Sequence, residues 1–194
     1  YYTNFYGVSN ITHPLENIER YKNQYNKQHR LLATGKGIVT LYDTKKFNRG
    51  DNYNHSLKFT TTFTEDLRMN NNTSFLDPHK TSWGRNQYGE ASDTRSTDLV
   101  TVWDNVLNYT TNMNGHNLDV MLGSSYTHSM WTQSYIAGSH FADGTIQTLN
   151  AANKIDPGST NTTASEWAIM SGFARVSYNY ESRYLISANM RADG

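Results

Sequence analysis

Histidine and carboxylate side chains are the groups of this sequence best suited to acid–base or metal chemistry. The seven histidines stand at positions 13, 29, 55, 79, 116, 128 and 140. None lies four residues from another or has a glutamate at the spacing of a zinc hydrolase. Glu65 and Asp66 are adjacent, and neighbours on a strand point to opposite faces, so solvated strand ends explain them better than a glycosidase pair. We therefore expect no catalytic residue, no metal site, no cofactor and no enzyme.

Other functional motifs are missing as well. The sequence has neither a G-x-S-x-G nucleophile elbow nor a G-x-x-x-x-G-K-[ST] phosphate loop, and Gly35-Lys36-Gly37 is an isolated fragment. The 17 basic residues balance 17 acidic ones without a basic run, which argues against nucleic-acid binding. The absence of cysteine excludes disulfides and thiolate zinc sites.

Aromatic and polar residues in the last third of the chain are the best candidates for contact with a ligand or partner. They lie in or beside a stretch of about 32 residues between positions 133 and 166, and long loops often carry recognition. The candidates are Trp131, Tyr135, His140, Phe141 and Asp143. A solvated loop anchored by its aromatic residues explains the same pattern equally well.

The elements that would position these side chains are β-strands. The 22 Asn, 23 Thr, 17 Ser and 14 Tyr suit strands and long loops. The mean hydropathy of −0.74 and the absence of a run of about 20 apolar residues exclude a spanning helix, whereas a transmembrane β-barrel is apolar only at alternate residues. Alternation predicts six strands, at residues 31–41, 56–64, 99–111, 116–130, 168–180 and 184–191. Residues 116–130 exceed the usual 5–6 residues of a soluble strand.

The alternation also assigns side chains to two faces. The predicted apolar, lipid-facing set includes Leu118, Val120, Leu122, Val176, Ile186 and Met190. The predicted polar, lumen-facing set includes Asp119, Arg175, Asn189 and Arg191. One face would then contact lipid and the other the polar lumen, as in a membrane barrel.

The connections alternate in length. Residues 112–115 and 181–182 predict tight hairpins, about 28 residues separate positions 69 and 98, about 32 separate 133 and 166, and the connection 43–55 is intermediate. Short turns alternating with long loops are typical of outer-membrane barrels. We expect Tyr109, Tyr178, Tyr180 and Tyr184 beside the short turns, and Tyr126, Trp131 and Trp167 beside the long loops, in aromatic belts. A soluble β-sandwich would also show alternation with interior aromatics.

Several stretches resemble a known family. Residues 115–126, GHNLDVMLGSSY, resemble the GKHNLDVLLGxSY hairpin of the SusC/RagA family of TonB-dependent outer-membrane transporters. Residues 167–194 resemble its W…FGRVNYNYxxRYLLxAxxRxDGSS segment. Shorter landmarks are matched, in the same order, by residues 13–19 and 149–152, with poor correspondence across residues 43–55 and 70–97.

The resemblance implies an all-β, antiparallel, up-and-down transmembrane barrel segment. Residues 1–194 would supply about six to seven strands of a 22-stranded barrel, not closed by themselves, with the plug, signal peptide and remaining strands absent. It further implies import of large nutrients, such as glycans or peptides, across the outer membrane of a Gram-negative, Bacteroidetes-like bacterium. The expected partners are outer-membrane lipid, a SusD-like lipoprotein, the nutrient ligand, and TonB acting through the absent plug. The alternative is a secreted soluble β-sandwich module that binds carbohydrate.

Overall fold

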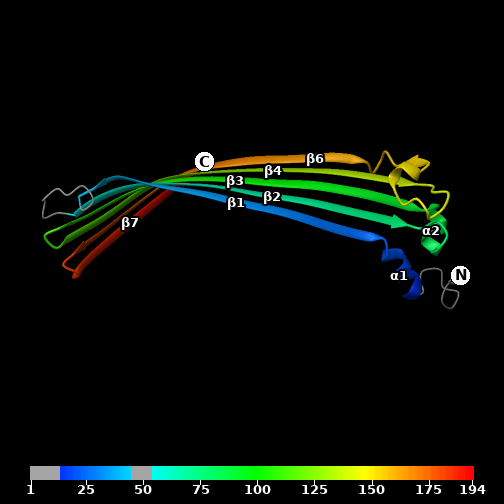
Figure 1. Cartoon of the computed structure of the whole chain (residues 1–194), viewed down its shortest axis with the longest axis horizontal. Helices are drawn as coiled ribbons and strands as arrows, with labels where there is room; N and C mark the ends of the chain where they lie inside the picture. The colour runs from blue at the N-terminus through cyan, green and yellow to red at the C-terminus, as the bar shows by residue number, and fades with distance from the viewer. Residues whose placement is uncertain (1–13, 45–53) are drawn as a thin grey trace. The chain divides into compact units, whose positions relative to one another are not determined.

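The computed structural model describes residues 14–44 and 54–194, which form mainly β-strands (Figure 1). Helix α1 (Pro14–Tyr21) precedes β1 (Gln24–Asp43) and β2 (Asn54–Leu76); α2 (Ser82–Gln87) precedes β3 (Glu90–Met113) and β4 (His116–Ser139). The short helix η2 (Leu149–Ala151) and β5 (Lys154–Ile155) precede β6 (Asn161–Tyr180) and β7 (Tyr184–Asp193). The predicted connection 43–55 falls largely on residues 45–53, outside the described ranges.

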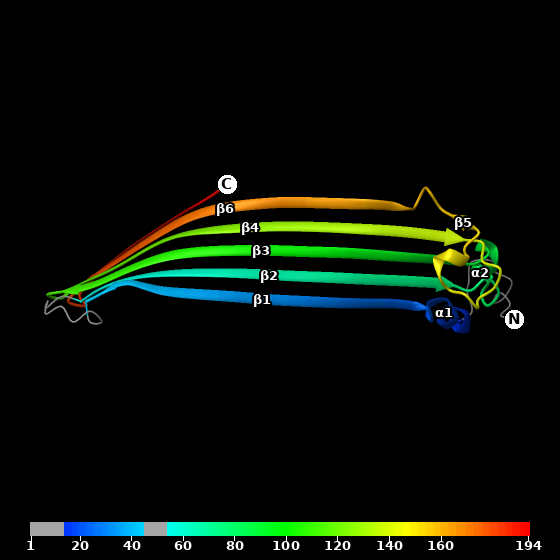
Figure 2. The same cartoon turned by 45° about the horizontal axis from the view of Figure 1, so that its top comes forward.

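All the described strands belong to one antiparallel sheet in the order β1-β2-β3-β4-β6-β7, with β5 paired to β4. The long strands β1, β2, β3, β4 and β6 run side by side in chain order (Figure 2). This up-and-down order confirms the predicted fold class, and no pairing between β1 and β7 closes the described sheet. A β-sandwich requires two packed sheets, so the alternative reading is wrong for this part of the chain.

The strands are longer than predicted, and the long loops are shorter. Strands β3 and β4 each have 24 residues, so the two long connections are residues 77–89 and 140–160. Some of the missed strand ends, such as residues 70–74 of β2 and 92–98 of β3, are polar on both faces, where alternation gives no signal. These two ends are joined by contacts such as Ser74 Oγ to Ser92 Oγ at 2.7 Å. The expectation that Tyr126, Trp131 and Trp167 flank the long loops was also wrong, because they lie inside β4 and β6. Among the described residues, none of the helices has the length and apolar content of a membrane-spanning segment.

The chain forms two compact units. Of the described residues, unit 1 comprises 14–30, 68–98 and 130–165 and holds the helices and both long connections. Unit 2 comprises residues 31–44, 54–67, 99–129 and 166–194 and holds the two short turns between β3 and β4 and between β6 and β7.

The register of β6 and β7, within unit 2, confirms the predicted faces. Arg175 lies opposite Asn189, and Val176 lies opposite Ala188. Residues directly opposite each other share a face, and neighbours along a strand alternate. Val176, Ile186 and Met190 therefore share one face, and Arg175, Asn189 and Arg191 share the other. We call these the apolar face and the polar face.

Strand β4 extends the same two faces. Asp119 Oδ1 lies 3.5 Å from the Arg175 guanidinium, which puts Asp119 on the polar face. By alternation Leu118, Val120 and Leu122 lie on the apolar face, as predicted.

Each of the two short turns, residues 114–115 and 181–183, contains two successive residues with a left-handed backbone. Asn114 and Gly115 have φ of 47° and 82°, and Glu181 and Ser182 have φ of 46° and 58°. Two successive left-handed residues form the turn whose twist matches a hairpin, and glycine adopts this conformation without steric cost. In the second turn the Asn179 side chain accepts a 2.9 Å hydrogen bond from the Ser182 N–H. The predicted tight hairpins are confirmed.

Unit 1 contains the apolar core. Phe75 from β2, Ala91 from β3 and Phe141 from the second long connection are buried together, and Leu149, Ala151 and Ala152 pack against them. The rings of Phe75 and Phe141 meet edge to face with centroids 5.2 Å apart, a favourable aromatic arrangement. This core fixes the connection 140–160 onto the strands.

Candidate functional site

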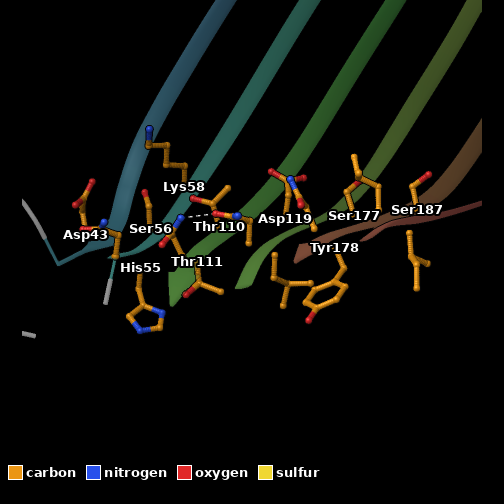
Figure 3. Close-up of a pocket in the computed structure, with 17 residues that line it drawn as sticks. Asp43, His55, Ser56, Lys58, Thr110, Thr111, Asp119, Ser177, Tyr178 and Ser187 are labelled. Carbon is orange, nitrogen blue, oxygen red and sulfur yellow. Dashed lines mark hydrogen bonds between the residues drawn. The ribbon is translucent and has the colours of Figure 1, made fainter. Parts of the chain in front are cut away.

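A hollow of about 660 Å³ lies in unit 2, near the short turns, and its lining residues come from both faces of the sheet (Figure 3). Most of its lining comes from the polar face of β2, β3, β4, β6 and β7, because alternate residues of these strands are serine, threonine, asparagine or charged. The lining includes Ser56, Lys58, Thr110, Asp119, Ser177 and Ser187. Such a surface can exchange hydrogen bonds with a polar partner.

Two polar-face atoms of lining residues have unmet hydrogen-bonding capacity. Ser56 Oγ and Asp119 Oδ1 are buried and have no hydrogen-bond partner among the described residues. The 3.5 Å separation of Asp119 from Arg175 is an ion pair too long for a good hydrogen bond. Buried polar groups are normally satisfied. These atoms therefore mark the hollow as a surface suited to a polar partner, and sequence reasoning missed it because its residues are distant in the chain.

The five predicted contact residues all belong to unit 1. Trp131 and Tyr135 are half-buried in β4, whereas His140, Phe141 and Asp143 lie at the start of the connection 140–160. Phe141 is only 5% exposed, so its side chain serves the core. His140 is exposed, with φ of 64°, and stacks on Tyr88 at 5.0 Å. Their contact with a ligand stays a prediction.

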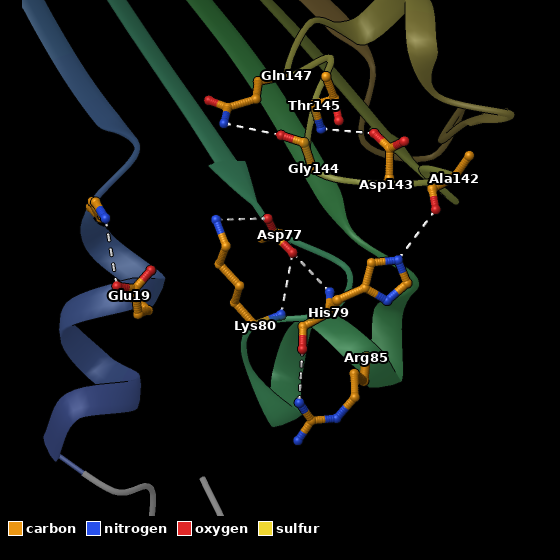
Figure 4. Close-up of polar contacts among 11 residues, drawn as sticks. Glu19, Asp77, His79, Lys80, Arg85, Ala142, Asp143, Gly144, Thr145 and Gln147 are labelled. Carbon is orange, nitrogen blue, oxygen red and sulfur yellow. Dashed lines mark hydrogen bonds and ion pairs between the residues drawn. The ribbon is translucent and has the colours of Figure 1, made fainter. Parts of the chain in front are cut away.

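The two long connections are held together by a polar cluster (Figure 4). Asp77 Oδ1 accepts hydrogen bonds from the N–H groups of His79 and Lys80 at 2.9 and 3.2 Å, and Lys80 Nζ lies 3.3 Å from Asp77 Oδ2. His79 Nε2 lies 3.3 Å from the Ala142 carbonyl oxygen, and Arg85 donates to the His79 carbonyl at 3.1 Å. The Asp77-Pro78 pair was the one sequence signal for this turn.

Two carboxylates in the second connection, those of the exposed Asp143 and the half-buried Asp156, have lowered pKa values. The Thr145 N–H donates to Asp143 Oδ1 at 2.7 Å, and this bond lowers the pKa of Asp143, with smaller contributions from the Thr145 hydroxyl and the His79 charge. The Ser159 hydroxyl, followed by the Gly158 N–H, lowers the pKa of Asp156. Hydrogen bonds that favour the charged form have this effect. Both carboxylates brace local turns, and no group of three potential metal ligands occurs within residues 14–44 and 54–194.

Comparisons with known proteins decide the fold family. No family model matches the sequence. Over 92 residues, 47% of this chain, the sequence is 33% identical to TonB-dependent receptor P39 of Formosa agariphila, and the match spans 9% of that protein. The RagAB peptide importer in its open-open state matches 99% of this chain with a TM-score of 0.68 at 15% identity. The resemblance to the SusC/RagA family is confirmed.

Other solved states agree with this SusC/RagA-like fold. The RagAB peptide transporter gives a TM-score of 0.67 over 99% of this chain at 15% identity, and the closed-closed importer gives 0.62 over 89% at 14% identity. At such identities the structural likeness shows the fold alone. This chain covers 18% of the closed-closed chain and 20% of the chains in the other two structures.

Proposed function

We propose that this chain forms part of the barrel wall of a SusC/RagA-like TonB-dependent transporter in the outer membrane of a Bacteroidetes-like bacterium. The observation that carries the proposal is the match of nearly the whole antiparallel sheet to the RagAB importer, at a TM-score of 0.68 over 99% of the chain. The sequence likeness to a TonB-dependent receptor from Formosa agariphila supports it independently.

The two-faced strands support a membrane location. Ile186 and Met190 are 68% and 72% exposed on the apolar face, and the opposite face carries Arg175, Asn189 and Arg191. Barrel strands that separate lipid from a polar lumen have this alternation. A membrane crossing takes about 9–11 tilted residues, so strands of 20–24 residues, the lengths of β1–β4 and β6, exceed what the bilayer needs.

The polar-face side of the unit 2 hollow would meet the plug region of the parent transporter. Its buried, unpartnered Ser56 and Asp119 oxygens favour a polar partner over lipid. TonB would act on that plug, and a SusD-like lipoprotein would form the lid of the barrel while a large nutrient such as a glycan or peptide is imported. Transport makes no covalent bond here, so the chain needs no catalytic residue or cofactor.

Membrane fractionation of cells that make the full-length parent tests the proposal. We expect recovery in the outer membrane and a band on a detergent gel that shifts only after boiling, as expected if a stable barrel resists unfolding in detergent. Recovery in the soluble fraction without a shift would contradict it.

A further inference from the structure

Two histidine–tyrosine pairs repeat the same geometry within unit 2. His55 Nδ1 on β2 lies 2.8 Å from the Tyr109 hydroxyl on β3, and His116 Nδ1 on β4 lies 2.6 Å from the Tyr178 hydroxyl on β6. The rings are stacked in both, with centroids 6.1 and 6.0 Å apart and interplanar angles of 21° and 28°. In each pair a histidine within the first two residues of a strand bonds to a tyrosine of the following long strand.

Both pairs lie at the end of the apolar face, next to the turns. Tyr178 is directly opposite Ile186, and His116 is two residues from Leu118 on the same side of β4. His55 is likewise two residues from Leu57. Two further aromatic rings follow His116. The ring centroids of His116 and Tyr180 are 4.5 Å apart, and the Tyr180 ring stacks on that of Tyr184 with centroids 6.5 Å apart.

The Tyr–His bond occupies Nδ1 of each imidazole and leaves Nε2 to bond outward. When the phenol O–H donates to Nδ1, the neutral ring carries its proton on Nε2, which becomes a hydrogen-bond donor. No described residue bonds to Nε2 of His55 or His116. A purely apolar belt would not need this donor, because phenylalanine stacks equally well.

We propose that His55 and His116, oriented by Tyr109 and Tyr178, bind the phosphate of phospholipid headgroups through Nε2–H. The inference rests on the proposed membrane location, because it needs lipid against the apolar face. Beyond the hydrocarbon layer the first acceptors that a side chain meets are the phosphate and ester oxygens of the lipid. The occupant is a lipid and not free phosphate, since Leu57, Leu118 and Ile186 beside the pairs would contact its acyl chains.

The test uses the purified, delipidated full-length parent. Native mass spectrometry measures binding of phosphatidylglycerol, of diacylglycerol with the same chains, and of inorganic phosphate. We expect phosphatidylglycerol to bind, and the double variant His55→Phe/His116→Phe to bind it about tenfold or more weakly, because a hydrogen bond to a charged group is lost at each ring. Diacylglycerol binding should not change. Equal phosphatidylglycerol binding by wild type and double variant, or binding of inorganic phosphate as tight as that of the lipid, would overturn the proposal.

His128→Phe is the matched control. His128 also lies on β4 on the apolar side, but its Nε2 is 2.7 Å from Glu166 Oε1, so we expect wild-type lipid binding. If the double histidine variant lacks the boiling-dependent shift, Tyr109→Phe/Tyr178→Phe decides the question, because it keeps every ring and removes only the bonds that orient the imidazoles. Wild-type phosphatidylglycerol binding by this variant would overturn the proposal. If the proposed membrane location were itself wrong, the fractionation experiment would show it first, because the full-length parent would be absent from the outer membrane.

Discussion

Asp77 and Gly144 are in direct contact across the two long connections of unit 1, so closely that a Cβ at Gly144 would overlap the Asp77 carboxylate. The same carboxylate accepts the backbone hydrogen bonds of His79 and Lys80. The absence of a side chain at residue 144 therefore allows the turn at Asp77 and the connection 140–160 to pack together.

Gly144→Ala should loosen this packing. The new methyl group must displace the Asp77 side chain, and overpacking of this kind typically costs about 1–3 kcal/mol. We expect faster proteinase K cleavage within residues 140–160 of the folded parent. Gly158→Ala is the control, because its Cβ would meet only Asp156 Oδ1 at 3.4 Å. Equal cleavage of both variants would mean that the close approach is unimportant.

Phe141 and His140 are neighbours with opposite surroundings. Phe141→Ala removes a ring that is 5% exposed and in contact with Phe75, so we expect a loss of about 3–5 kcal/mol of local stability. Rapid proteinase K cleavage within residues 140–160 would reveal this loss of stability. His140→Ala should leave cleavage near wild type while weakening any ligand contact at this connection. If both variants were equally cleaved, His140 would have a structural role instead.

Val120 and Ser125 test the assignment of faces. An arginine on the lipid side of a barrel costs about 2–4 kcal/mol near the midplane, whereas lumen positions tolerate charge. We therefore expect Val120→Arg to reduce the fraction of parent with the boiling-dependent shift. Ser125→Arg should fold normally, because residue 125 is on the polar face and bonds to Asp104, which can pair with the new charge. Equal tolerance of both substitutions would reject the assignment.

Alternation made the face of Val176 and Ile186 predictable, because each strand repeats every two residues whatever its partner. It failed for residues 70–74, where Asn, Thr and Ser occupy both faces and the strand is recognisable only by its pairing with β3. Contacts such as His55 with Tyr109, 54 positions apart, depend on a register that no local pattern encodes. The same holds for the polar cluster around Asp77, whose partners come from two connections.

Gly123 and Phe173 form a second close approach, in unit 2. A Cβ at Gly123 would overlap the Phe173 ring, and the Arg191 guanidinium lies 6.0 Å from the centre of that ring. Gly123→Ala should displace Phe173 and lower barrel stability by about 1–3 kcal/mol, seen as a lower temperature for the gel shift. Gly172→Ala, whose Cβ would meet no atom within 4 Å, is the matched control on β6. A gel-shift temperature of Gly123→Ala equal to that of wild type would show that β4 and β6 adjust without strain.

The hydrogen bond from Thr145 to Asp143 predicts an acid response of the connection 140–160. Because this bond lowers the pKa of Asp143 in the folded state, its stabilisation is present above the ordinary aspartate pKa and is lost as the pH falls through the lowered value. We expect hydrogen exchange at the Thr145 amide, corrected for its intrinsic pH dependence, to lose protection only below about pH 4. In Asp143→Ala the amide should be unprotected at every pH. Protection of the Thr145 amide that is the same in Asp143→Ala as in wild type would mean that the Asp143 carboxylate does not hold this turn.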